Sequence, residues 1–106
     1  MPDRENQAVA LVYELPAFGR FVLIEGPTAL TQAGLEGIAA SCQSGCATTL
    51  AIEPLRDGTR AMLIDGEVSK GYMWIRNGVR FNLFGPADTF SITRARTVAN
   101  MIANQR

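Results

Sequence analysis

Two glycine-containing dipeptides within one apolar stretch constrain this chain more than any other feature. Between residues 60 and 84, Asp65-Gly66 and Asn77-Gly78 separate three segments rich in aliphatic and aromatic side chains. Asp-Gly and Asn-Gly favour two-residue hairpin loops, because the central residues of such loops need positive φ angles. The sequence therefore predicts a meander of three antiparallel strands over 60–64, 67–76 and 79–84.

The remaining sequence predicts three more strands and two helices. The segment 8–15 is apolar at both odd and even positions, as in the central strand of a sheet. Strands are also predicted at 20–25 and 48–53, and apolar residues at helical spacing predict helices capped by Thr31 and Thr93. Because the strands come in local hairpins, the predicted class is α+β: an antiparallel sheet of five to six strands, in two hairpin or meander units, with two helices packed on one face.

The length and composition indicate one globular domain. The chain has 106 residues, of which 47% are hydrophobic and 19% charged, which suits a single core. We expect one domain over residues 1–106, with flexible ends at 1–7 and 104–106. No apolar run approaches the 18 residues of a membrane span, and the apolar run after the polar first residues is too short for a signal peptide. We therefore expect a cytoplasmic protein that does not enter a membrane.

The hairpin at Asn77-Gly78 predicts which side chains share a face of the sheet. A two-residue loop places Trp74 opposite Phe81 and Tyr72 opposite Leu83, and directly opposed residues lie on the same face. We expect this aromatic face to form the core rather than a surface on which bases stack. The other face carries Met73, Ile75 and Phe84 beside Arg80. Helices on one side would leave these apolar residues uncovered, so we predict that they contact a partner.

Opposite charges gather in the two halves of the chain. Residues 1–67 contain four basic and nine acidic residues, a net charge of −5, and residues 68–106 contain six basic residues and one acidic residue, a net charge of +5. Such asymmetry suggests nucleic-acid binding, with four candidate contacts, Arg76, Arg80, Arg94 and Arg96. The alternative is that the two halves interleave in space and neutralise each other.

The first predicted helix is nearly free of charge. Between residues 27 and 50 the one charged residue is Glu36. Small residues follow one side of the helix (Ala33, Gly37, Ala40, Ser41 and Ser44), and two glycines, Gly34 and Gly37, lie within it. Glycine inside a helix is unfavourable. It is tolerated where another backbone comes close, either the chain's own sheet or a partner. We predict self-association as a homodimer through this helix or through the uncovered face of the sheet.

Several catalytic and metal-binding chemistries lack their usual residues. The chain has no histidine, the commonest general base, and a single lysine, Lys70, against nine arginines. Cys42 and Cys46 cannot complete a tetrahedral metal site within one chain, so we expect two small core residues. No cofactor fingerprint occurs. The sequence therefore predicts a protein that is not an enzyme and has no metal site and no cofactor.

Once these chemistries are set aside, binding to another molecule is the function that we expect. We expect a small non-enzymatic protein that acts on a macromolecular partner, as an inhibitor, immunity, regulatory or accessory protein of the kind that mobile elements encode. A protein partner is expected, and a homodimer as well. The alternative is a nucleic-acid-binding protein that uses the basic hairpin and the helix at the C-terminal end.

Overall fold

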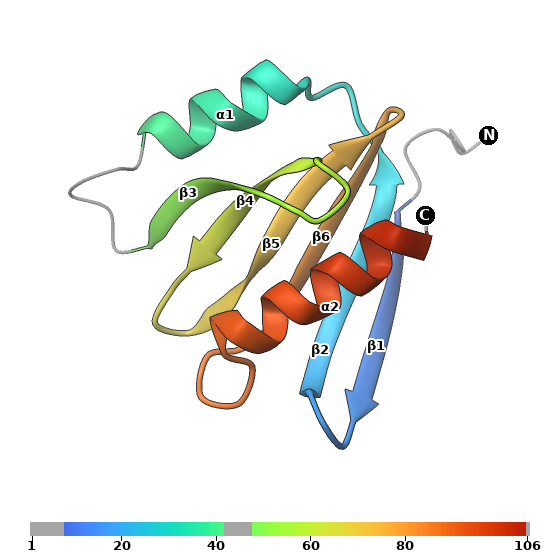
Figure 1. Ribbon diagram of the computed structural model, residues 1–106, viewed down its shortest axis with the longest axis vertical. Coiled ribbons are helices and arrows are strands. Elements are labelled where there is room, and N and C mark those ends of the chain that lie inside the picture. Colours follow the sequence, from blue (N-terminus) through green and yellow to red (C-terminus); the bar gives the residue numbers. More distant parts are fainter. Residues whose placement is uncertain (1–7, 42–47, 106) are drawn as a thin grey trace.

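A six-stranded antiparallel sheet with two helices forms the protein. The computed structural model describes residues 8–41 and 48–105. The strands lie in the order β1-β2-β6-β5-β4-β3, so β1 and β3 form the edges (Figure 1). In chain order the elements are β1 (Val9–Leu15), β2 (Gly19–Pro27), α1 (Gln32–Ser41), β3 (Thr49–Pro54), β4 (Arg60–Asp65), β5 (Ser69–Arg76), β6 (Val79–Pro86) and α2 (Ile92–Gln105).

The predicted α+β class and antiparallel sheet are confirmed. In the β5–β6 hairpin Asn77 and Gly78 have φ angles of 53° and 76°, as a tight two-residue turn requires. Trp74 pairs with Phe81 and Tyr72 with Leu83. The register follows from this turn, as predicted.

One face of the sheet, here called the α2 face, carries the larger core cluster. Trp74 is 1% exposed, and its ring stacks on Phe81 with centroids 5.2 Å apart. Buried side chains of α2, among them Ala95, Val98 and Ala99, pack in the same cluster. The expectation that the aromatic face forms the core is therefore confirmed.

The expectation that both helices cover one face is wrong. In the second core cluster Leu35 and Ala39 of α1 pack with Met62 of β4. The strand residues of this cluster alternate along their strands with the residues of the α2 face, so their side chains point to the other face of the sheet. α1 therefore lies on the opposite face, here called the α1 face, against β3 and β4. The physical reason is that β4 and β5 carry apolar residues at both parities, so each face of the sheet needs a cover.

The turn between β4 and β5 also differs from the expectation. Asp65 pairs with Lys70, so the connection is longer than the predicted two-residue loop at Asp65-Gly66. Met62 pairs with Met73 and Leu63 with Tyr72. A two-residue loop would have moved these apolar residues out of alignment. Cross-strand packing therefore outweighs the local turn preference here.

The helices begin at side-chain caps. Thr31 caps α1, as predicted, because its Oγ1 accepts a hydrogen bond from Gly34 N at 3.1 Å. The cap of α2 is Ser91 rather than Thr93, since Arg94 N donates to Ser91 Oγ at 3.2 Å. α2 continues to Gln105, so residues 104 and 105, expected to be flexible, belong to this helix. Cys42 and Cys46 lie outside the described residues.

Candidate functional site

Two of the four candidate arginines form ion pairs that hold α2 and the strand ends together. Arg96 on α2 makes two hydrogen bonds to the Glu53 carboxylate of β3, from Nε at 2.8 Å and from Nη2 at 2.9 Å. Arg76 at the end of β5 donates to Asp57 Oδ2 at 3.1 Å and to the Ala103 carbonyl at 3.0 Å. Both arginines therefore have partners from within the chain.

Arg94 and Arg80 lie apart from this group. Arg94 donates to the Thr89 carbonyl just before α2 at 2.6 Å. Arg80 is exposed on β6, on the α1 face beside Ile75, and no hydrogen bond or ion pair of its side chain is found among residues 8–41 and 48–105. The structure thus does not gather the four arginines into one basic surface.

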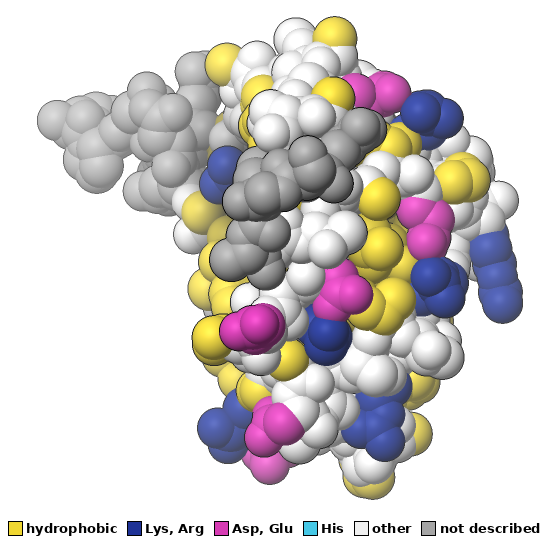
Figure 2. All heavy atoms as spheres, turned by 90° about the vertical axis from the view of Figure 1, so that its left-hand side faces the viewer, with side chains coloured by type: hydrophobic (Ala, Val, Ile, Leu, Met, Phe, Trp, Pro, Cys, Tyr) yellow, Lys and Arg dark blue, Asp and Glu magenta, His cyan; other side chains and the backbone are white. Residues whose placement is uncertain are grey.

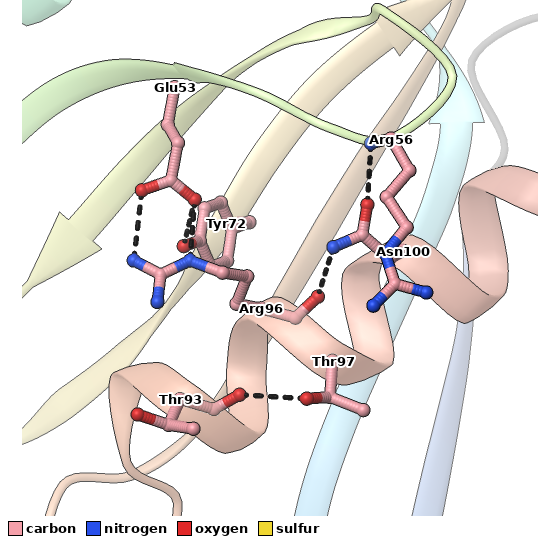
Figure 3. A network of polar contacts seen from close by, with 7 residues as sticks. All are labelled: Glu53, Arg56, Tyr72, Thr93, Arg96, Thr97 and Asn100. Carbon is pink, nitrogen blue, oxygen red and sulfur yellow. Dashed lines mark hydrogen bonds and ion pairs between the residues drawn. The ribbon is translucent and has the colours of Figure 1, made fainter.

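The contacts of Glu53 form the centre of a polar network between β3 and α2 (Figure 3). Tyr72 donates its hydroxyl proton to Glu53 Oε2 at 2.7 Å. Asn100 on α2 accepts a hydrogen bond from Arg56 N at 2.7 Å. The hydrogen bonds from Arg96 lower the pKa of Glu53 below its ordinary value, and burial next to Glu53 raises the pKa of Tyr72. The network fixes α2 against the sheet, and its hydrogen bonds favour the ionised form of Glu53.

Charges of both signs alternate on the surface. Three ion pairs join the acidic half of the sequence to the basic half: Glu53–Arg96, Asp57–Arg76 and Asp65–Lys70. Two others, Glu14–Arg20 and Glu36–Arg60, lie within the acidic half. Figure 2 shows acidic and basic side chains next to one another on the side of the molecule where α1 and β3 lie. This arrangement favours the alternative in which the two halves neutralise each other within the fold.

The three candidate apolar residues have different surroundings. Met73 and Ile75 are half-buried and pack against the cluster under α1, which corrects the expectation that this part of the sheet is uncovered. Phe84 on β6 is also half-buried, but it belongs to neither core cluster. α1 does not reach it, because α1 packs against β3 and β4.

Phe84 belongs to an apolar surface on the other half of the α1 face, over β1, β2 and β6. Cross-strand pairing puts Val12, Val22 and Phe84 in one row and Ala10 and Ile24 in the next. No helix among residues 8–41 and 48–105 covers this surface. We call it the open half-face; its residues are Ala10, Val12, Val22, Ile24 and Phe84.

The open half-face ends at β1, whose outer edge pairs with no strand of the described chain. The sequence of β1, VALVYEL, contains one charged residue, Glu14. The other edge, β3, carries Glu53 and Pro54 and lies next to α1. Charge, proline and a covering helix are the usual protections of an edge strand. β1 has little of this protection, so it is the edge that can accept another strand.

A groove borders β1 on the α2 face as well. It measures about 140 Å³ and lies between the β1–β2 hairpin and α2. Its walls are mostly apolar and include Tyr13, Leu15, Phe18, Val98, Met101 and Ile102, with Gln105 as a polar member. We call it the hairpin groove. Together, the open half-face, the free edge and the hairpin groove give β1 apolar surface on both sides of an unpaired backbone.

The composition of β1 was the sequence signal for this site. A strand that is apolar at both parities indicated a central position, and the structure shows that this expectation is wrong, because β1 is an edge strand. The side chains suit a strand with neighbours on both sides. Val12, Val22 and Ile24 were not among the candidate residues, because their exposure depends on the strand order.

The described residues contain neither a cluster of metal-binding side chains nor a membrane-spanning helix. No group of three or more cysteine, aspartate or glutamate residues able to hold a metal ion occurs among them. Within the same residues, no helix is long and apolar enough to cross a membrane. No protein-family model, no curated protein and no solved structure matches this chain. The site must therefore be interpreted from its own geometry.

Proposed function

We propose that this chain is a small non-enzymatic protein that acts by binding a protein partner through β1. The observation that carries the proposal is that β1 combines an unpaired backbone edge with apolar surface on both faces of the sheet. A strand added to such an edge gains main-chain hydrogen bonds, and its alternate side chains reach the two flanking surfaces. A role as an inhibitor, immunity, regulatory or accessory protein in the cytoplasm is part of the proposal.

The chemistry of the site favours a protein segment over other partners. The open half-face and the hairpin groove are lined mainly by aliphatic and aromatic side chains. An extended segment with alternating apolar residues would bury these surfaces, which is the main source of affinity in protein interfaces. Two of the charged side chains nearby, Glu14 and Arg20, form an ion pair at 3.6 Å.

The test compares the full chain with a variant in which one exposed side chain of β1 is charged. Val12 is 68% exposed, so Val12→Glu should leave the fold intact while placing an unpaired charge in the interface. The matched control is Val68→Glu, because Val68 is 86% exposed and lies between β4 and β5, away from the site.

Each protein is used as bait in native lysate, and retained proteins are identified by mass spectrometry. A purified partner is then measured by titration, with hydrogen exchange of the β1 amides. We expect the wild-type chain and Val68→Glu to bind alike, Val12→Glu to bind at least tenfold more weakly, and the β1 amides to be protected in the complex. Binding that is unchanged in Val12→Glu, with β1 amides exchanging as in the free chain, would refute the proposed site.

The nucleic-acid alternative has a separate test. Arg80 is the candidate arginine whose side chain remains without a partner among the described residues, and Trp74 is buried and cannot stack on a base. A mobility shift at low salt, with an affinity that falls steeply as salt rises, would favour this alternative. Arg80→Ala should then weaken the shift.

A further inference from the structure

We propose that a second copy of this chain occupies the edge of β1, so that two six-stranded sheets join into one continuous sheet of a homodimer. In this arrangement β1 pairs antiparallel with β1 of the second copy about a two-fold axis at Val12. The inference rests on the proposed function, because it names the strand that the β1 edge accepts.

The length of β1 and the pairing rules select this arrangement. A two-fold axis perpendicular to a sheet makes equivalent strands antiparallel and keeps the two α2 faces on the same side. With the axis at Val12, every residue of β1 (Val9–Leu15) has a partner in β1 of the other copy. An axis at Leu11 or Tyr13 would leave two residues at one end of the strand unpaired. The pairs across the axis would be Val9 with Leu15, Ala10 with Glu14, Leu11 with Tyr13, and Val12 with Val12.

The charge on β1 is compatible with this arrangement. Glu14 is the one charged residue of β1, and the axis at Val12 places it opposite the small side chain of Ala10. An axis at Glu14 would place two glutamates directly opposite each other, which destabilises a strand pair. Glu14 would also keep its ion pair with Arg20 of its own chain, since Arg20 lies on β2 and not at the free edge.

The apolar side chains that the dimer would bury are exposed in the single chain. Val9, Val12 and Leu15 are 55%, 68% and 38% exposed, and all three lie on β1. On the α1 face, two open half-faces would meet at Val12 and form one apolar row from Phe84 through Val22 to the other copy. On the α2 face, Val9 of each copy would lie beside Leu15 at the rim of the other copy's hairpin groove. Burial on both faces adds to the main-chain hydrogen bonds.

A second copy satisfies all of these features at once. The segment that pairs with β1 needs seven extended residues, apolar side chains toward both faces, and no charge opposite Glu14. The chain itself supplies such a segment in β1. The edge strand with a central-strand composition is thereby explained, because in the dimer β1 lies in the middle of the sheet.

The first experiment measures the mass of the full chain in solution by light scattering and by sedimentation over a range of concentrations. We expect a dimer for the wild-type chain and for Val68→Glu, and a monomer for Val12→Glu. Val12→Glu should keep the far-ultraviolet circular dichroism of the wild-type chain and unfold in a single thermal transition, which shows that its fold is intact. A monomeric wild-type chain at the highest concentration, or a Val12→Glu protein that stays dimeric, would overturn the inference.

The second experiment tests whether the two copies meet at Val12. Val12→Cys and, as control, Val68→Cys are made on a Cys42→Ser, Cys46→Ser background and treated with a short bismaleimide. Rapid cross-linking of Val12→Cys into dimers, with little for Val68→Cys, supports the proposed axis, and equal cross-linking of the two variants contradicts it. The proposed function has its own outcome: a monomeric wild-type chain whose binding to another protein is lost in Val12→Glu would refute self-pairing and leave the binding site in place.

Discussion

At the scale of single residues, two glycines of the chain differ in the space that their surroundings leave for a side chain. A Cβ added to Gly71 on β5 would lie 1.8 Å from the Leu83 carbonyl oxygen, whereas a Cβ added to Gly37 on α1 would meet no atom within 4 Å. The backbone of β6 cannot move away from Gly71 without disturbing the sheet. The small residues that drew attention to α1 therefore do not all reflect close packing within the chain, since Gly37 is exposed.

We predict that Gly71→Ala lowers the free energy of unfolding by about 3 kcal/mol, because the added methyl group overlaps backbone atoms. Gly37→Ala should raise it by up to about 1 kcal/mol, because alanine is the better helix former. Urea unfolding followed by the fluorescence of Trp74, the one tryptophan of the chain, measures both. Equal stability of Gly71→Ala and the wild-type chain would show that β5 and β6 lie less close together than the structure has them.

A second prediction at this scale concerns Glu53 and acid. Its folded-state pKa is held below the ordinary value of about 4.5, chiefly by hydrogen bonds from Arg96. A carboxylate with a lowered folded pKa stabilises the fold at pH values above its unfolded pKa, and this stabilisation is lost as the pH falls through the folded pKa. The urea concentration at the unfolding midpoint of the wild-type chain should therefore decrease as the pH is lowered below about 4.5.

Glu53→Gln is the matched variant. Its side-chain carbonyl can still accept the hydrogen bond from Tyr72, but it neither carries a charge nor titrates. We expect a lower urea midpoint than wild type at pH 7 and a smaller further decrease in acid. Parallel decreases in both proteins would mean that Asp57 and Glu36, whose pKa values are also lowered, account for the acid sensitivity instead.

Burial of single residues could be predicted from the sequence, but their ion pairs could not. Trp74 was placed in the core because a two-residue turn only three residues away fixes its register. Arg96 and Glu53 lie 43 residues apart, and Arg76 and Asp57 lie 19 apart. Such pairs depend on which strand becomes the neighbour of α2, and local sequence patterns do not contain this information.

At the scale of elements, the N-terminal cap of α2 tests a prediction made from the local sequence. Both Ser91 and Thr93 are residue types that cap helices, and the apolar spacing did not separate them. In the structure Ser91 directly precedes α2 and its Oγ accepts the Arg94 N–H, whereas Thr93 lies inside the helix (Ile92–Gln105).

We predict that Ser91→Ala destabilises the protein by about 1 kcal/mol, because it removes the acceptor for an unpaired N–H. Thr93→Ala should change stability by less than about 0.5 kcal/mol, as for other exposed positions. Chemical unfolding of the two variants side by side decides between the caps. A larger loss for Thr93→Ala would restore the assignment made from the sequence.

The positions of whole elements show where sequence patterns stop being informative. The hairpins were predicted because their signals are local, as in Asn77-Gly78. The face that α1 covers was not, because apolar residues at both parities of β4 and β5 allow a helix on either side. The same ambiguity led to β1 being placed in the centre of the sheet, although the strand order puts it at the edge.

At the scale of the whole molecule, the two core clusters lie on opposite faces but share strands. Met62 of the α1 cluster and Ala61 of the α2 cluster are neighbours on β4, and Met73 and Trp74 are neighbours on β5. Loss of one cluster should therefore loosen the strands on which the other depends, and the chain should unfold in a single cooperative step.

We predict that Leu35→Ala, in the α1 cluster, lowers the free energy of unfolding by about 2–4 kcal/mol. Leu35 is fully buried against Met62, so truncation leaves a cavity under α1. The effect should be seen in Trp74 fluorescence, although Trp74 lies on the opposite face, and the midpoint from circular dichroism should coincide with it. If the helical signal instead falls early while the Trp74 transition stays at its wild-type position, α1 unfolds separately, and the sheet with α2 forms the cooperative unit without it.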